Sequence, residues 1–128
     1  AYLLAAVLIF IVFMFIRDYK ETKLILNSNS IEFQGDYGEI VPFEGIKSIQ
    51  LVNEKPKIIK RTNGFSAGTI KKGYYETDKG EIVKLILNEE NKPYILITKS
   101  DGKKIYYSAK EESNEKLFDS INKIFPNI

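Results

Sequence analysis

A run of basic residues is the feature of this 128-residue sequence that most clearly indicates chemistry. The run has no acidic residue between Glu54 and Glu76, and its basic residues are Lys55, Lys57, Lys60, Arg61, Lys71 and Lys72. The remaining 13 basic residues face 17 acidic ones, so the net charge of +2 comes from this run. A lysine or arginine held near an acidic leaflet contributes on the order of 1 kcal/mol. The run predicts a contact with an anionic ligand or membrane surface; a solvated loop is the alternative.

Arg61 and four residues near it shape this run. Apart from Arg17, Arg61 is the only arginine. Its guanidinium could bind a carboxylate or phosphate through two hydrogen bonds, or it could hold its own loop by bonding backbone carbonyls or an internal acid. Asn63 and Gly64 are typical of a turn with positive φ, and Gly68 and Gly73 are typical of a bend or bulge in a strand. We therefore assign these four residues, Asn63, Gly64, Gly68 and Gly73, to the architecture of a structural loop.

Several kinds of chemistry are excluded by composition. The chain has no cysteine and no histidine, which removes thiolate nucleophiles, histidine-based triads and imidazole-bound metals. The adjacent acidic pairs Glu89-Glu90 and Glu111-Glu112 have diverging side chains, and no glycine-rich loop leads into a helix. We therefore predict no catalytic residue, no metal site and no cofactor. We also expect no nucleic-acid binding, because no element offers a helix with spaced basic residues.

The first 16 residues are all apolar, which is typical of a transmembrane helix. A helix of this length rises about 24 Å, less than the hydrocarbon core of about 30 Å, so we expect a transmembrane helix that is truncated at its N-terminus. A buried core helix is the alternative. Arg17, Lys20 and Lys23 predict, by the positive-inside bias, a cytoplasmic domain at the cell membrane. The predicted organisation is a transmembrane helix over 1–16, a juxtamembrane flank over 17–21 and one domain over 22–128.

The rest of the chain has the pattern of a mainly β protein, with short apolar runs separated by turn residues. Pro42 confines one short strand, near 39–43, to a sheet edge. Asp101-Gly102 predicts a type I′ hairpin, in which both residues have positive φ. Alternation predicts a half-exposed strand over 81–88, whereas 93–99 should be covered on both faces. Seven main strands are predicted, at 22–27, 30–35, 46–53, 68–77, 81–88, 93–99 and 103–108.

The period changes after these strands. Ser108 and Glu111 form a capping-box pattern, and Pro126 would stop a helix. Between them apolar residues recur at helical spacing: Leu117, Phe118, Ile121, Ile124 and Phe125. The sequence therefore predicts one amphipathic helix over 110–125 that packs its apolar stripe on the sheets.

These elements, in this order, resemble the bacterial pleckstrin-homology (PH) domain families that are attached to membrane helices. The resemblance covers residues 22–125 and rests on PKIIKRTNGFSAGTIKKGYY at 56–75, PYILI at 93–97, DGKKIYYS at 101–108 and the charged helix. It implies a PH-like seven-stranded barrel of two sheets capped by the helix, with no described catalytic residues. Phosphoinositide-binding PH domains carry several basic residues across the first hairpin, whereas 23–34 has Lys23 alone. Inositol-phosphate recognition of that kind is therefore not expected.

The function hypothesis that follows is a non-catalytic, membrane-anchored PH-like interaction or regulatory module on the cytoplasmic face. Its predicted partner is a protein, a peptide or another segment of its own assembly. The alternative is binding of anionic lipid headgroups through the basic stretch 55–72.

Overall fold

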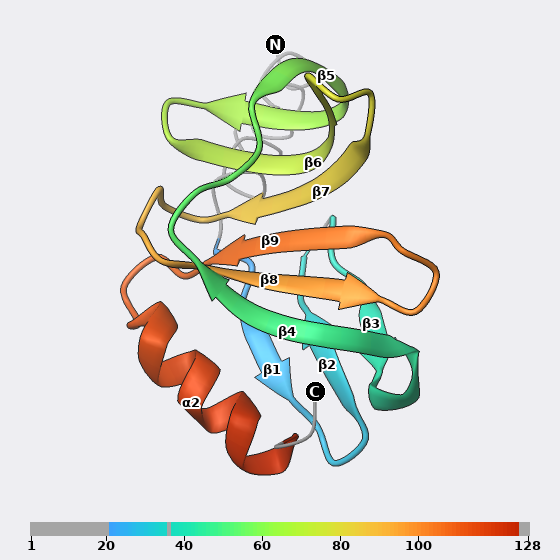
Figure 1. Cartoon of the computed structure of the whole chain (residues 1–128). Helices are drawn as coiled ribbons and strands as arrows, with labels where there is room; N and C mark the ends of the chain where they lie inside the picture. The colour runs from blue at the N-terminus through green and yellow to red at the C-terminus, as the bar shows by residue number, and fades with distance from the viewer. Residues whose placement is uncertain (1–20, 36, 126–128) are drawn as a thin grey trace, which may run out of the picture.

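The computed structural model describes residues 21–35 and 37–125. The predicted transmembrane helix at 1–16 and most of its flank lie outside these residues. In the described part, the chain forms nine strands in two sheets and one C-terminal helix (Figure 1). The elements are β1 (Leu24–Leu26), β2 (Ser30–Phe33), β3 (Ile40–Pro42), the 3₁₀-helix η1 (Phe43–Gly45), β4 (Ile46–Val52), β5 (Ile58–Ala67), β6 (Ile70–Thr77), β7 (Ile82–Leu87), β8 (Tyr94–Lys99), β9 (Lys104–Ser108) and α2 (Asn114–Ile124). The prediction of a mainly β chain with a C-terminal helix is confirmed.

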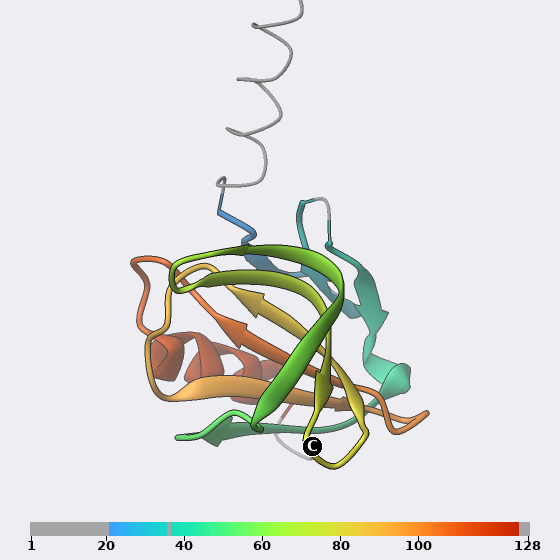
Figure 2. The same cartoon turned by 90° about the horizontal axis from the view of Figure 1, so that it is seen from above.

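The smaller sheet is the antiparallel meander β1-β2-β3. The larger sheet has the order β4-β8-β9-β7-β6-β5, with β7 and β9 parallel and the other pairs antiparallel. Figure 2 shows the large sheet strongly curled, with the β5–β6 hairpin at one end. Among the described strands, β4 and β5 each have a neighbour on one side only, so the sheet does not close, and the prediction of a seven-stranded barrel is wrong. The sequence predicted eight of these nine strands, counting the short one near 39–43. The strand that it did not predict is β5.

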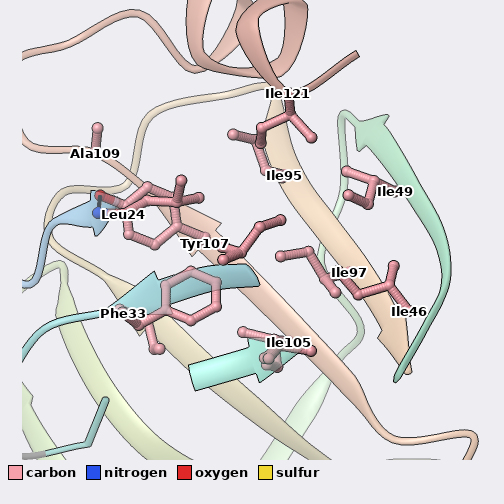
Figure 3. Packing of buried hydrophobic residues seen from close by; sticks show 13 residues of the cluster. Leu24, Phe33, Ile46, Ile49, Ile95, Ile97, Ile105, Tyr107, Ala109 and Ile121 are labelled. Carbon is pink, nitrogen blue, oxygen red and sulfur yellow. Dashed lines mark hydrogen bonds between the residues drawn. The ribbon is translucent and has the colours of Figure 1, made fainter. Parts of the chain in front are cut away.

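The main hydrophobic core lies where one face of the large sheet packs against the small sheet and α2. Figure 3 shows this packing, in which Phe33 from β2 lies beside Tyr107 from β9 and Ile121 projects from the helix. Fully burying an isoleucine or leucine side chain contributes roughly 1.5–3 kcal/mol. The buried residues of this cluster are Leu24, Ile31, Phe33, Val41, Ile46, Ile49, Ile86, Ile95, Ile97, Ile105, Tyr107, Ala109 and Ile121.

A second buried cluster lies on the opposite face of the large sheet. Val52 and Ile58, which flank the connection between the two edge strands, pack against it. Its buried members are Tyr75, Val83, Leu85, Leu87, Tyr94, Leu96 and Tyr106. Strand β7 is therefore covered on both faces, and the half-exposed strand predicted from its alternation is wrong. The prediction that β8 is covered on both faces is confirmed over Tyr94–Ile97.

Helix α2 differs from its prediction at the N-terminus. It begins one turn later than the pattern indicated, and its N-cap is Ser113, whose Oγ accepts a hydrogen bond from the Lys116 backbone at 3.3 Å. Ser108 is instead buried at the end of β9. Ile121 is fully buried and contacts the core, whereas Ile124 is 50% exposed. Among the described residues, no helix has the length and apolar character needed to cross a membrane.

The β8–β9 hairpin forms at Asp101-Gly102 as predicted, but with a different turn. Gly102 has φ of 89°, whereas Asp101 is not in the positive-φ region. The Asp101 carboxylate accepts a hydrogen bond from the Lys103 backbone at 3.0 Å, and Gly102 N–H donates to Lys99 O at 2.9 Å. The type I′ assignment is therefore wrong, because glycine alone takes the left-handed conformation here.

Candidate anion-binding site

The basic stretch 55–72 is not a loop but contains a long strand. Strand β5 pairs with β6 in antiparallel register, with irregularities between Ile58 and Lys60 and between Arg61 and Asn63. Ala67 pairs with Ile70, so the connecting turn has two residues, and Gly68 takes φ of 60° there. The turn predicted at Asn63-Gly64 is wrong, because both residues lie within β5.

Two glycines allow the two strands to approach closely. Gly64 and Gly73 are cross-strand partners, and a Cβ on Gly73 would lie 2.5 Å from Gly64 Cα. No side chain is tolerated at that distance without movement of backbone. Gly73, like Gly64, therefore has an architectural role, but in a strand pair and not in a loop.

Strand geometry separates the six basic residues. Successive side chains of a strand point to opposite faces, so Lys71 and Lys72 diverge. Lys72 is buried, 4% exposed, whereas Lys60 and Arg61 are exposed on β5. The structure brings three of the six together around one cavity: Lys55, Lys57 and Lys71.

This cavity, which we call the basic pocket, has a volume of about 380 Å³ and lies beside β8. Lys92, from the β7–β8 connection, adds a fourth ammonium group, and Glu54 and Glu90 supply two carboxylates. Sequence reasoning missed Lys92 because it is 20 residues beyond Lys72 and has no distinguishing neighbour. The other lining residues are Pro56, Ile58 and Tyr94.

The electrostatics of the basic pocket favour an added anion. Lys55 is paired with the Glu90 carboxylate, and its Nζ lies 5.8 Å from the centroid of the Tyr94 ring. Burial lowers the pKa of Lys55, and the charges of Lys71 and Lys92 lower it further. A bound anion would offset this repulsion, because an opposite charge within a few ångströms stabilises the ammonium form.

Arg61 lies outside the basic pocket. It stands opposite Tyr75 in the strand register. Burial raises the pKa of Tyr75, and the Arg61 charge opposes that rise together with the hydrogen bond from Ser66. Within the described residues no hydrogen bond or ion pair holds the guanidinium, so its predicted role in fixing a loop is not observed.

Buried asparagines position the loop that supplies Glu90 and Lys92. The Asn88 side chain donates to Thr22 O at 2.8 Å and to Ser108 O at 3.0 Å, and it accepts from Thr22 N at 2.6 Å. At the other end of the loop, Asn114 Nδ2 donates to Asn91 O at 3.0 Å and to Pro93 O at 2.9 Å. The sequence contains no recognisable signal for this role, because it depends on segments distant in the chain.

Comparisons with known proteins give no further guide to the site. Neither the models of known protein families, nor the curated proteins, nor the solved structures contain a match to this chain. Across 21–35 and 37–125, no group of three acidic side chains is arranged to hold a metal ion.

Proposed function

We propose that this chain is a non-catalytic, membrane-anchored interaction module at the cytoplasmic face, and that it binds an anionic headgroup in the basic pocket. The observation that carries the proposal is the convergence of Lys55, Lys57, Lys71 and Lys92 on one open cavity. Of the two functions predicted from the sequence, we favour anionic lipid over a protein partner at this site, because its tyrosine, Tyr94, is buried and offers little apolar surface to a peptide side chain.

The membrane setting comes from the sequence. It rests on the apolar segment 1–16 and on the basic residues that follow it. We also propose a distant relationship to PH domains, supported by the order of elements: strands first, then one amphipathic helix packed on the sheet. Barrel closure is not part of this proposal.

The test uses the full chain reconstituted in lipid nanodiscs. Nanodiscs of phosphatidylcholine are compared with nanodiscs that also contain phosphatidylglycerol, and acetylation of each lysine by a neutral reagent is followed by mass spectrometry. We expect slower acetylation of Lys57, Lys71 and Lys92 with acidic lipid, and no change at Lys116 on α2. High salt should remove the protection, because the Debye length falls from about 10 Å at 0.1 M to about 3 Å at 1 M.

Two controls identify the source of the anion. Inorganic phosphate added to neutral nanodiscs tests a soluble ligand. If phosphate slows the acetylation of the pocket lysines and acidic lipid does not, the ligand is free phosphate and not a lipid headgroup. The variant Lys57→Glu/Lys71→Glu should lose the protection of Lys92, whereas Lys103→Glu/Lys116→Glu, with the same change in charge, should keep it. Equal acetylation in all nanodiscs would contradict the proposal.

A further inference from the structure

A second surface lies on the opposite face of the β6–β7 pair from the basic pocket. Tyr74 and Ile82 are 41% and 45% exposed, although both are large and apolar or aromatic. Tyr74 pairs with Lys84 and Glu76 pairs with Ile82, so Tyr74 and Ile82 share one face of the sheet. They line a cavity of about 210 Å³, the lysine-rimmed pocket, whose other residues are Lys84, Lys99, Lys103, Lys104 and Ile105.

Two lysines of the lysine-rimmed pocket already bind a carboxylate of the chain itself, although that carboxylate does not line the pocket. Glu39, next to β3, accepts hydrogen bonds from Lys84 Nζ at 2.9 Å and from Lys99 Nζ at 2.7 Å. Lys84 is only 6% exposed, and its Nζ lies 5.4 Å from the centroid of the Tyr74 ring. Lys84 thus lies between a carboxylate and the aromatic ring that lines the pocket, which shows that a lysine of this pocket can bind a carboxylate close to an aromatic surface.

The charges of the lysine-rimmed pocket are only partly compensated. Lys84 and Lys99 share the single negative charge of Glu39, so one of their two positive charges stays uncompensated. Glu81 lies 3.5 Å from Lys104 and compensates its charge. Lys103 has no carboxylate within ion-pair distance among the described residues. Four ammonium groups therefore meet two carboxylates, which leaves an excess of two positive charges around an apolar floor.

We propose that the lysine-rimmed pocket docks an acidic, extended segment of a protein partner. A bulky apolar side chain of that segment packs on Tyr74 and Ile82, and its flanking carboxylates reach Lys99, Lys103 and Lys104. This inference rests on the proposed function in one respect, that the chain is an interaction module. It does not depend on headgroup binding, because the basic pocket and the lysine-rimmed pocket lie on different faces of β6.

Charge complementarity selects this occupant. In a two-fold symmetric contact, a second copy of the chain would bring the same lysine-rich pocket to this surface, which is unfavourable. A flat acidic bilayer would place its negative charge against Glu39 and Glu81 as well as against the lysines. A peptide can place a carboxylate at Lys103, which has no ion pair among the described residues, while its apolar side chain covers Tyr74.

The test is a selection from a random peptide display library on the full chain in dodecyl maltoside micelles. We expect enrichment of peptides with an aromatic or aliphatic residue flanked by acidic residues. Affinity for a selected peptide, measured by fluorescence anisotropy, should fall roughly tenfold or more in Tyr74→Ala and in Lys103→Glu. Lys116→Glu, an equal charge change on α2, should leave it unchanged. Both test residues are exposed, and equal unfolding midpoints would confirm that the variants fold.

Four results would overturn the inference. Selected peptides without acidic and apolar enrichment would exclude the stated chemistry. Equal weakening by Lys103→Glu and Lys116→Glu would show general charge attraction. If only Lys57→Glu/Lys71→Glu lost peptide binding, the peptide would bind in the basic pocket. If the chain self-associated and Tyr74→Ala abolished this self-association, the occupant would be a second copy. The nanodisc experiment is independent of all four, so failure of one proposal is distinguishable from failure of the other.

Discussion

The centre of the large sheet and its β5 edge are stabilised in different ways. In the centre, β8, β9 and β7 are buried on both faces between the two clusters, and five of the six residues of β7 are buried. At one edge, β5 is the longest strand, yet none of its ten residues is buried. Figure 1 shows why: the small sheet and α2 lie beside the β4 end, and β5 and β6 project away from them. Burial stabilises the centre of the sheet, whereas β5 depends on its pairing with β6.

The largest effect expected from this contrast is at the helix contact with the core. Ile121→Ala should lower the free energy of unfolding by about 2–5 kcal/mol, because it removes a fully buried side chain and leaves a cavity. Ile124→Ala, on the exposed side of the same helix, should change it by less than about 0.5 kcal/mol. Urea unfolding of both variants measures the difference, and equal effects would mean that α2 is not docked through Ile121.

A smaller loss is expected from the buried polar contacts next to the central strand β7. Asn88→Ala removes three hydrogen bonds and takes away the acceptor of the buried Thr22 N–H, whereas Thr22 O keeps its bond from the Tyr107 hydroxyl; the change should cost about 1–3 kcal/mol. Asn63→Ala on the exposed β5 is the matched control and should be nearly neutral. A neutral Asn88→Ala would show that water replaces the asparagine and that the loop carrying Lys92 is not held by it.

The β5–β6 hairpin should respond locally. Gly73→Ala places a Cβ against Gly64 and should cost roughly 1–3 kcal/mol, mainly by separating β5 from β6. Amide hydrogen exchange should accelerate in β5 while β8 and β9 keep their protection. Faster exchange in all strands together would mean that the centre of the sheet and its β5 edge unfold as one unit.

The smallest effect concerns the ion pairs that join the two sheets. Burial raises the pKa of Glu39, but the hydrogen bonds from Lys99 and Lys84 outweigh it and hold the pKa below 4.5. A carboxylate with a lowered folded-state pKa stabilises the fold above its unfolded pKa, and this contribution is lost as pH falls from about 4.5. The advantage of the parent chain over Glu39→Gln, about 1 kcal/mol at neutral pH, should therefore vanish in acid. An advantage that persists there would exclude charge as its cause.

The same contrast explains which elements sequence patterns predict. Tyr94–Ile97 is a continuous apolar run, and its burial on both faces follows from composition alone. By contrast, β5 contains Lys60, Arg61, Thr62 and Asn63 in succession, with neither alternation nor an apolar run. It is a strand because β6 offers it a partner, and pairing of that kind leaves no hydrophobic period in the sequence.

The candidate sites follow the same rule. The run of basic residues indicated an anionic contact, but strand alternation sends Lys71 and Lys72 to opposite faces, and the loop after β7 brings in Lys92. The lysine-rimmed pocket could not be predicted, because its lysines come from β7, β8, β9 and the turn between the last two. A run of charged residues shows which side chains are close in sequence, whereas a pocket requires side chains from different strands to be close in space.

The sequence by itself determined the elements that depend on local pattern: the mainly β character, the hairpin at Asp101-Gly102 and the amphipathic C-terminal helix. Each follows from residue type at a spacing of a few positions. Only the tertiary structure decided the strand order, the parallel pairing of β7 with β9, and the groups of lysines around the two pockets. Those features depend on which segments, distant in the sequence, pack their apolar faces against each other and so exclude water. This packing is decided by the whole chain and not by any local pattern.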